Sequence, residues 1–293
     1  VTNENQLDRA VRVQKKVLDE VRLQRQELIA INQRLTKLET EQQTMNAVLT
    51  KLSKRISHLE PNLQAVLRLL KLDPEALPYP QRLMANRYRL NSQNGEDGIT
   101  LALFAQVGTT NRRFIEIGSG LSGGNSACLA SELGWVGLML DGDSERMIQV
   151  GRRFPGVRAV GAWITRENVN ALIRDAGFEG EVDFVSIDLD GNDYWVWEAL
   201  TVCSPRVVVV EYNSAFGPDR AVTIPYDAQF DRHKYRFVYY GASLAALEKL
   251  AAAKGYRLVT TEPTGVNAYF LRNDVGPEIP ACTAKDAYRL LKR

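Results

Sequence analysis

The stretch "FIEIGSGLSGGNS", Phe114 to Ser126, decides the fold, because a short apolar run leads directly into a loop of glycines and serines. The loop contains the spacing G-x-G-x-x-G through Gly118, Gly120 and Gly123. Glycines at the end of a buried strand let the backbone turn sharply and approach a bound nucleotide closely. The stretch therefore predicts a strand, a nucleotide-binding loop and a helix in succession.

The same succession repeats along the rest of the chain. Five apolar segments, each with a helical segment after it, predict parallel strands covered on both faces: "RFIEIG", "VGLMLD", "VRAVGAW", "VDFVSID" and "RVVVVEY". Two later segments, "YRLVTT" and "NAYFLR", are separated by five residues, too few for a crossover helix. They predict an antiparallel hairpin. The expected fold class is therefore α/β and Rossmann-like, with five parallel strands and a C-terminal antiparallel hairpin.

Residues 1–72 have a different pattern, with apolar residues spaced alternately three and four apart. One seam position holds Leu7, Gln14, Val21, Leu28, Leu35, Gln42, Leu49, Ile56 and Leu63, and the other holds Ala10, Val17, Gln24, Ile31, Leu38, Met45, Leu52 and Leu59. This heptad repeat predicts a coiled-coil helix that self-associates, with dimer and trimer both open. The prolines in residues 73–90 predict a linker, and residues 91–293 form the expected catalytic domain.

Composition excludes some classes of partner. A formal net charge of +2 over 293 residues gives no support for nucleic-acid binding. No apolar run is long enough for a transmembrane segment, and three widely spaced cysteines suit a reducing compartment. We expect a cytoplasmic protein, and a peripheral place beside a membrane-associated glycan assembly stays open.

Glycine spacing alone does not choose the nucleotide. Asp141 lies about twenty residues past the loop, where a carboxylate can accept hydrogen bonds from ribose hydroxyls in both dinucleotide and S-adenosylmethionine (SAM) sites. Glu116 precedes the first glycine by two residues. A carboxylate there would repel a pyrophosphate but tolerate the positively charged methionine end of SAM. Together with the closing hairpin, this favours SAM over NAD.

Five parallel strands and a closing hairpin resemble the seven-stranded class I SAM-dependent methyltransferases. The segments "SQNGEDG", "FIEIGSG", "SIDLDGNDYWVWEAL", "VVVVEYNSAFGP" and "GVNAYFLR" are most similar to the FkbM-type group. The resemblance implies O-methylation, often of sugars or glycosylated products. The loop "GSGLSGGNS" is longer than the usual E-x-G-x-G-x-G, so the third glycine contact is Gly123 or Gly124.

The resemblance also implies roles for individual residues. Glu116, Gly118 and Gly120 would line the methionine end of SAM, and Asp141, or less favourably Asp143, would hold the ribose. Adenine would pack near Trp163, Ile164 and Thr165. In "NSQNGEDG", Gln93, Glu96 and Asp97 would cover the amino-acid end of the cofactor, or else Asn91 or Ser92 caps the following helix.

Acceptor chemistry is expected at the carboxyl ends of the fourth and fifth predicted strands, where Asp188, Glu211 and Asn213 lie. In one reading these three bind a divalent cation such as Mg²⁺, which would lower the pKa of a sugar hydroxyl. In the other reading no metal binds, and Asp188 polarises the acceptor or the cofactor. Asn192 or Asp193 could equally be the N-cap of the next helix.

His233 is the histidine available as a general base, because His58 falls at an outward heptad position. It lies in the loop Ser214–Gly241, whose aromatic residues suit a sugar acceptor; Tyr226 and Tyr240 are weaker candidates for the base.

The sequence thus predicts a SAM-dependent O-methyltransferase acting on a carbohydrate or glycan-linked acceptor, with Asp188, His233 and Glu211 as catalytic residues. A coiled-coil scaffold with a non-catalytic nucleotide-binding domain and a nicotinamide-dependent sugar oxidoreductase are the alternatives.

Overall fold

The computed structural model describes residues 2–71, 73–235 and 239–291, and the chain divides into two compact units, Val1–Glu60 and Pro61–Arg293. Within the long N-terminal helix, the side chains of residues 2–23 and of several residues between 54 and 71, His58 among them, lie outside the described set. In the part of the chain that the structure describes, no helix has both the length and the apolar character that a membrane span needs.

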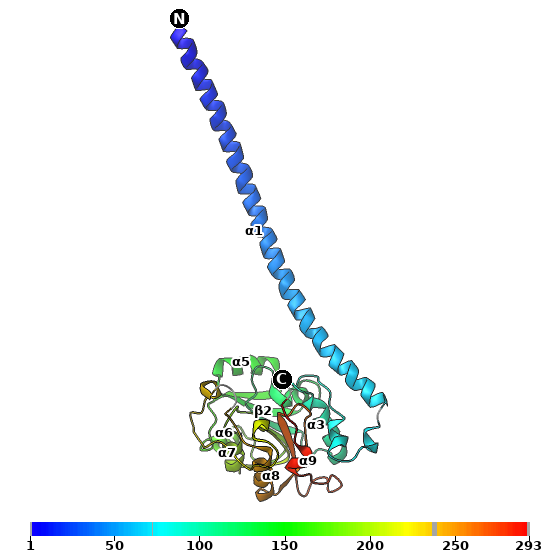
Figure 1. Cartoon of the computed structure of the whole chain (residues 1–293). Helices are drawn as coiled ribbons and strands as arrows, with labels where there is room; N and C mark the ends of the chain where they lie inside the picture. The colour runs from blue at the N-terminus through cyan, green and yellow to red at the C-terminus, as the bar shows by residue number, and fades with distance from the viewer. Residues whose placement is uncertain (1, 72, 236–238, 292–293) are drawn as a thin grey trace. The chain divides into compact units, whose positions relative to one another are not determined.

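The first unit belongs to one continuous helix, α1 (Thr2–Lys71), as the heptad repeat predicts (Figure 1). The seam residues Leu7, Ala10, Gln14, Val17 and Val21 lie outside the described side chains. The large apolar seam residues from Leu28 to Leu63 are 47–65% exposed. A single helix cannot bury such a stripe by itself, which favours a partner helix. The partner stays a prediction.

The second unit is built on a seven-stranded sheet with the order β3-β2-β1-β4-β5-β7-β6. The strands are β1 (Arg113–Ile117), β2 (Val136–Asp141), β3 (Val157–Gly161), β4 (Gly180–Ile187), β5 (Cys203–Glu211), β6 (Tyr256–Thr261) and β7 (Asn267–Arg272). The first five run parallel, and β7 pairs antiparallel with both β5 and β6. The predicted fold, five parallel strands closed by a C-terminal hairpin, is confirmed.

Helices cover both faces of this sheet (Figure 1). One face packs against α3 (Glu96–Val107), α4 (Ala127–Ser131) and α5 (Ser144–Arg153). The other packs against α6 (Val169–Asp175), α7 (Asp193–Ala199), α8 (Leu244–Ala253) and α9 (Ala284–Ala287). Because both faces are covered, the strands read as continuous apolar runs rather than alternating ones.

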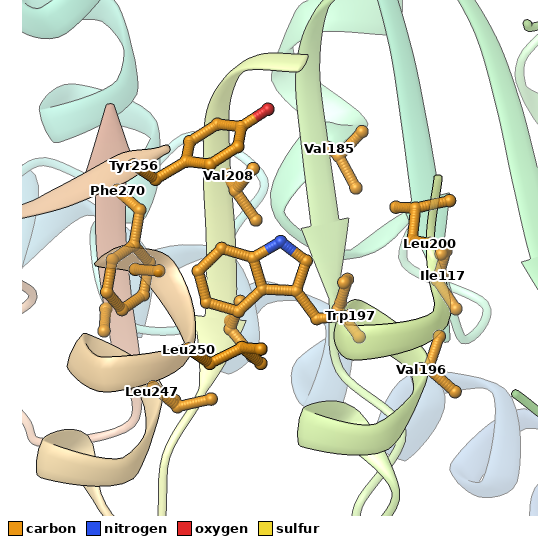
Figure 2. Packing of buried hydrophobic residues seen from close by; sticks show 14 of the residues in the cluster. Ile117, Val185, Val196, Trp197, Leu200, Val208, Leu247, Leu250, Tyr256 and Phe270 are labelled. Carbon is orange, nitrogen blue, oxygen red and sulfur yellow. The ribbon is translucent and has the colours of Figure 1, made fainter. Parts of the chain in front are cut away.

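Trp197 of α7 is the largest fully buried side chain on the second face. Its ring lies 4.8 Å from that of Phe270 on β7, with Leu247 and Leu250 of α8 beside it (Figure 2). This packing ties the antiparallel end of the sheet to the helices that follow β4 and β5.

Part of the proline-containing segment 73–90 belongs to the domain and is not a linker throughout. A 3-10 turn (Pro74–Ala76) is followed by the short helix α2 (Gln81–Met84). Leu83 is fully buried in the same apolar cluster as Ile99 and Leu103 of α3. A sequence rich in proline thus contributes a core residue.

The strand order reverses between β1 and β4, since β2 and β3 lie on one side of β1 and β4 and β5 on the other. In open α/β sheets the ligand site lies outside the carboxyl ends of the strands at such a reversal. Here that point lies between Gly118, after β1, and Asp188, after β4.

Candidate active site

A cavity of about 810 Å³ opens at the carboxyl ends of β1, β2, β4 and β5. Most of the predicted site residues line it: Gln93, Gly118, Gly120, Asp141, Asp143, Trp163, Ile164, Asp188, Glu211, His233 and Tyr240. The sheet topology has therefore gathered segments that lie more than 100 residues apart in sequence. The volume falls within the range of pockets that hold small-molecule ligands and cofactors.

The glycine loop forms one wall of the cavity. Gly118 has φ +90°, and a Cβ there would lie 1.7 Å from the carbonyl oxygen of Asp188, so the two strand ends meet too closely for any side chain. Gly120, at φ +56°, has nothing within 4 Å of its Cβ position, which leaves space beside the loop for a ligand. Gly124 lines the cavity, so it is the third glycine of this wall.

Glu116 lies behind the loop and does not line the cavity. It is fully buried, and its carboxylate accepts hydrogen bonds from the Asn125 amide at 3.3 Å and from the Ser126 amide at 2.9 Å, as well as from the Ser126 hydroxyl. A Cβ on Gly124 would lie 2.2 Å from this carboxylate. The expected contact with the methionine end of a cofactor is therefore corrected: Glu116 holds the loop in place.

Burial raises the pKa of Glu116 to about 7, although the Ser126 hydroxyl and neighbouring donors lower it. The group therefore changes charge near neutral pH in the folded chain.

Asp141 ends β2 at the cavity wall, as predicted. One carboxylate oxygen accepts the Gly120 amide at 2.9 Å, and the other accepts the Asp143 amide at 3.0 Å and lies 3.4 Å from Arg146. The side chain thus fixes the glycine loop while it faces the cavity. Asp143 is the N-cap of α5, accepting the Arg146 amide at 3.0 Å, so it is a poorer anchor for a ribose.

Only part of the segment predicted to pack adenine lies at the cavity. Trp163 is 56% exposed, lines the cavity and donates its indole N–H to the Ala228 carbonyl at 2.7 Å. Ile164 also lines the cavity and extends into the core below. Thr165 does not line it; its amide donates to Asn168 at 2.8 Å.

In "NSQNGEDG", Gln93 reaches the cavity, and the two acidic residues hold its loop. One oxygen of the buried Asp97 accepts the amides of Leu90, Asn91 and Ser92 at 2.8–2.9 Å. Glu96 binds the Asn94 amide at 2.7 Å and the Asn267 side chain at 2.9 Å. The N-cap of α3 is Gly95, so the predicted cap by Asn91 or Ser92 is wrong, although the Ser92 hydroxyl accepts the Asp97 amide at 3.2 Å in the first turn.

At the other end of the cavity, Asp188, Asp190 and Glu211 bring carboxylate oxygens within 4.8 Å of one another. Burial is the main cause that raises the pKa of Asp188 and of Glu211 well above the usual range, and the neighbouring carboxylates add to it. A raised pKa favours the protonated form, so these groups are suited to taking up a proton.

Arg232 lies among these acids, and sequence reasoning did not identify it. Its guanidinium pairs with Asp190, lies 3.7 Å from Glu211 and stacks 3.8 Å from the ring centre of Tyr240. The only sequence signal was its place beside His233 in a long aromatic loop. Arg146, at the glycine-loop end, was missed in the same way.

Three buried polar atoms at this end have no hydrogen-bond partner among the described residues: the acceptors Glu211 Oε2 and Asn192 Oδ1, and the donor Arg232 Nε. The Asn192 amide nitrogen donates to the Asp227 carbonyl at 2.8 Å, which leaves its oxygen unpaired. Buried acceptors without a donor are costly, so a ligand that supplies donors would be bound favourably here.

Asp193 and Asn213 have local structural tasks. Asp193 accepts the amides of Leu189 and Gly191, which shapes the "DLDGND" turn. Asn213 caps the turn after β5: its oxygen accepts the Ala215 amide at 3.0 Å, and its nitrogen donates to the Tyr240 carbonyl at 3.1 Å. Asn213 does not line the cavity, whereas Asp190 lies with Asp188 and Glu211 in the carboxylate group. A metal site that includes Asn213 stays a prediction.

His233 lies at the rim, with a 77% exposed side chain 2.9 Å from Asp231. Tyr240 is buried beneath Arg232, and burial raises its pKa further above the ordinary value. The Tyr226 hydroxyl donates to Glu167 and does not line the cavity. Of the three proton-transfer candidates in this loop, His233 and Tyr240 reach the cavity.

Comparison with solved structures returns methyltransferases. The N-terminal domain of EvdMO1 with S-adenosylhomocysteine (SAH) bound matches with 15% identity and a TM-score of 0.40, covering 61% of this chain and 80% of that one. An O-methyltransferase from Bacillus cereus in complex with SAH matches with 17% identity and a TM-score of 0.38, covering 73% and 89%.

The methyltransferase domain of bacterial CtHen1-C matches with 14% identity and a TM-score of 0.40, covering 61% of this chain and 98% of that one. No protein-family model matches the chain, and neither does any curated protein. These likenesses concern the fold and say nothing of the activity of this chain.

Proposed function

We propose that the protein is a SAM-dependent O-methyltransferase whose acceptor is a hydroxyl of a carbohydrate or glycan-linked molecule. The observation that carries the proposal is one continuous cavity with the glycine loop and Asp141 at one end and the acidic group of Asp188, Asp190 and Glu211 at the other. Such a cavity can hold a nucleoside cofactor and an acceptor side by side.

Charge favours SAM over a dinucleotide. The described residues that line the cavity include six carboxylates (Asp141, Asp143, Asp188, Asp190, Glu211 and Asp231) but two arginines, Arg146 and Arg232. Two of the six, Asp188 and Glu211, have raised pKa values, which favour the neutral form, but the other four still outnumber the arginines. This negative charge attracts the sulfonium and ammonium groups of SAM and repels the pyrophosphate of NAD.

In this assignment Gly118, Gly120 and Asp141 hold the cofactor at the loop, with Gln93 over its amino-acid end and Trp163 beside its adenine. Bound SAM would supply the methyl group, which an acceptor oxygen attacks in line as the carbon–sulfur bond breaks. The chain's task is to orient that oxygen and take its proton. Glu211 and Asp188 suit this task because their raised pKa values favour proton uptake, and His233 at the rim is the alternative base.

The acceptor end also favours a neutral polyol. Its unpaired atoms are two acceptors, Glu211 Oε2 and Asn192 Oδ1, and one donor, Arg232 Nε, and a hydroxyl group can both donate and accept. Its acidic residues would repel a phosphate or carboxylate on the acceptor. Phe230 at the cavity wall, stacked against Tyr235 with 5.4 Å between ring centres, offers an aromatic surface of the kind that packs against sugar rings.

A divalent cation at Asp188, Asp190 and Glu211 is a second possibility for this end. Three carboxylates fit the oxygen preference of Mg²⁺, but Arg232 already places a positive charge between two of them. A cation would therefore compete with Arg232. If activity persists in EDTA and does not rise with added Mg²⁺, the metal proposal fails and Arg232 is the counter-charge.

Calorimetric titration with SAH and with NAD tests the cofactor assignment. SAH should bind, and NAD should not. The oxidoreductase alternative has one Tyr-x-x-x-Lys spacing, Tyr288–Lys292; the Tyr288 hydroxyl donates to the Ser214 carbonyl at 2.6 Å, and Tyr288 does not line the cavity. Heat with NAD and none with SAH would reverse the assignment.

Mass spectrometry of products tests the acceptor. Neutral oligosaccharides and matched sugar phosphates are incubated with SAM, and a gain of one methyl group is expected on the neutral series. Methylation of the phosphates alone would contradict the charge argument. We also propose that α1 self-associates, because its apolar seam is exposed in the single chain. SAH binding without methylation of any acceptor would favour the scaffold alternative.

A further inference from the structure

The seam of α1 needs a partner, and the residues beside it indicate which way that partner runs. Leu28, Leu35, Leu38 and Met45 are 50–62% exposed along one stripe. The inference that follows rests on the proposed self-association and adds the direction and register of the two helices. The partner of the seam is α1 of a second copy of this chain.

In a parallel, unshifted pair, each residue just before a first-seam position faces the residue five places later on the other helix. Three of these facing pairs are oppositely charged: Glu20 with Arg25, Arg34 with Glu39, and Arg55 with Glu60. The remaining pairs between residues 13 and 53 each contain at least one uncharged residue, so none is repulsive. Arg34 and Glu39 are both exposed on α1 and available for such a contact.

The polar seam residues give an independent reason for the same direction. Gln14 and Gln42 occupy one seam position and Gln24 the other. In a parallel, unshifted pair, each glutamine faces its own copy, and the amides can hydrogen-bond to each other. In an antiparallel pair the two seam positions face each other, so Gln24 can meet Gln14 or Gln42 but not both. At least one glutamine would then face an apolar side chain.

We infer that α1 pairs with α1 of a second copy in parallel and without a shift in register. The C-terminal ends of both α1 helices then lie at the same end of the helix pair.

Cysteine cross-linking of the full chain tests direction and register. Gln14→Cys and Gln42→Cys are made separately and oxidised under mild conditions, with the wild type as the control for Cys128, Cys203 and Cys282. Both variants should give a disulfide-linked dimer. In an antiparallel pair, at most the variant nearest the centre of overlap could do so. A link in one variant or in neither overturns the inference.

Charge reversal tests the flanking pairs. Arg34→Glu should weaken self-association roughly ten-fold, because each dimer loses two attractive pairs and gains two repulsive ones. Adding Glu39→Arg should restore it. Lys51→Glu, an exposed outward charge on the same helix, is the matched control and should change little. Equal weakening by Arg34→Glu and Lys51→Glu overturns the pairing.

SAH titration of the same variants separates this inference from the proposed enzyme function. A wild-type chain that is monomeric in light scattering but binds SAH would overturn the self-association alone. An associated chain that links at both cysteines but binds no SAH would overturn the cofactor assignment alone.

Discussion

The two ends of the cavity differ in how completely the chain satisfies its own polar groups. At the glycine-loop end, the Asp141 carboxylate accepts two backbone amides and Glu116 holds the loop from behind. At the acidic end, Glu211 and Asn192 keep unpaired oxygens among the described residues. The first end is held together by the chain's own hydrogen bonds, and we expect the second to gain hydrogen bonds from a ligand. Substitutions at the two ends should therefore affect different measurements.

The largest effect is expected at the acidic end. Glu211→Gln keeps the shape of the side chain but removes its ability to take a proton, so turnover should fall about 10²- to 10⁴-fold. SAH affinity should change little, because Glu211 lies beyond the glycine loop. Initial rates with the acceptor found by product analysis, combined with SAH titration, measure both quantities.

Glu179→Gln, the same chemical change at an exposed residue outside the cavity, is the matched control. If Glu211→Gln weakened SAH binding as much as turnover, the two ends of the cavity would not be functionally separate.

The next largest effect is expected at Gly118, where the glycine loop lies closest to the Asp188 carbonyl. Gly118→Ala places a methyl group 1.7 Å from the Asp188 carbonyl oxygen in a left-handed backbone conformation, so the β1 and β4 ends must separate. We expect a loss of more than about 3 kcal/mol in the free energy of unfolding, together with weaker SAH binding.

Gly177→Ala is the control, because Gly177 also has positive φ, +75°, but has nothing within 4 Å of its Cβ position. It should cost about 1 kcal/mol. Denaturant unfolding of both variants checks the difference, and equal costs would show that the contact with Asp188 is not tight.

These residues also show what the sequence could predict. The strands followed from apolar runs bounded by polar residues, and their carboxyl ends located the site, because topology brings those ends together. The direction in which a side chain points was harder to predict than the strand that carries it. The spacing E-x-G around Glu116 is the same whether the carboxylate faces the cavity or the loop behind it. Asn213 follows a strand as a ligand would, but its oxygen caps a turn.

Arg232 could not be located from sequence, because its position depends on how a long loop folds back over β5. No periodicity places such a residue. By contrast, Gly118 and Asp141 were found because strand ends fix their positions.

The pKa of Glu116 gives a pH-dependent effect at the glycine-loop end. Its rise from 4.5 to about 7 means that the folded chain binds this proton more tightly than the unfolded chain. The free energy of unfolding should therefore fall as pH rises from about 4.5 to 7, by about 3 kcal/mol from this group. Below pH 4.5 both states are protonated, and the contribution is constant.

Glu116→Gln removes the titrating group and should flatten this part of the profile. Urea unfolding of wild type and variant at several pH values between 4 and 8 measures the difference. Parallel profiles would mean that Glu116 stays ionised, with its donors Ser126 and Asn125 outweighing burial.

The smallest effect concerns direct contact with the cofactor. Asp141→Asn should weaken SAH binding by about 1.5–3 kcal/mol, because the ribose loses a charge-assisted hydrogen bond. Part of this loss is indirect. The asparagine side chain has one acceptor oxygen, so it cannot accept the backbone amides of both Gly120 and Asp143 as the two aspartate oxygens do. Asp143→Asn separates the two roles: Asp143 caps α5 through its side chain, so its replacement should lower stability slightly and leave SAH affinity nearly unchanged. If Asp143→Asn weakened binding more than Asp141→Asn, the ribose anchor would be Asp143. The glycine-loop end of the cavity would then extend to the first turn of α5.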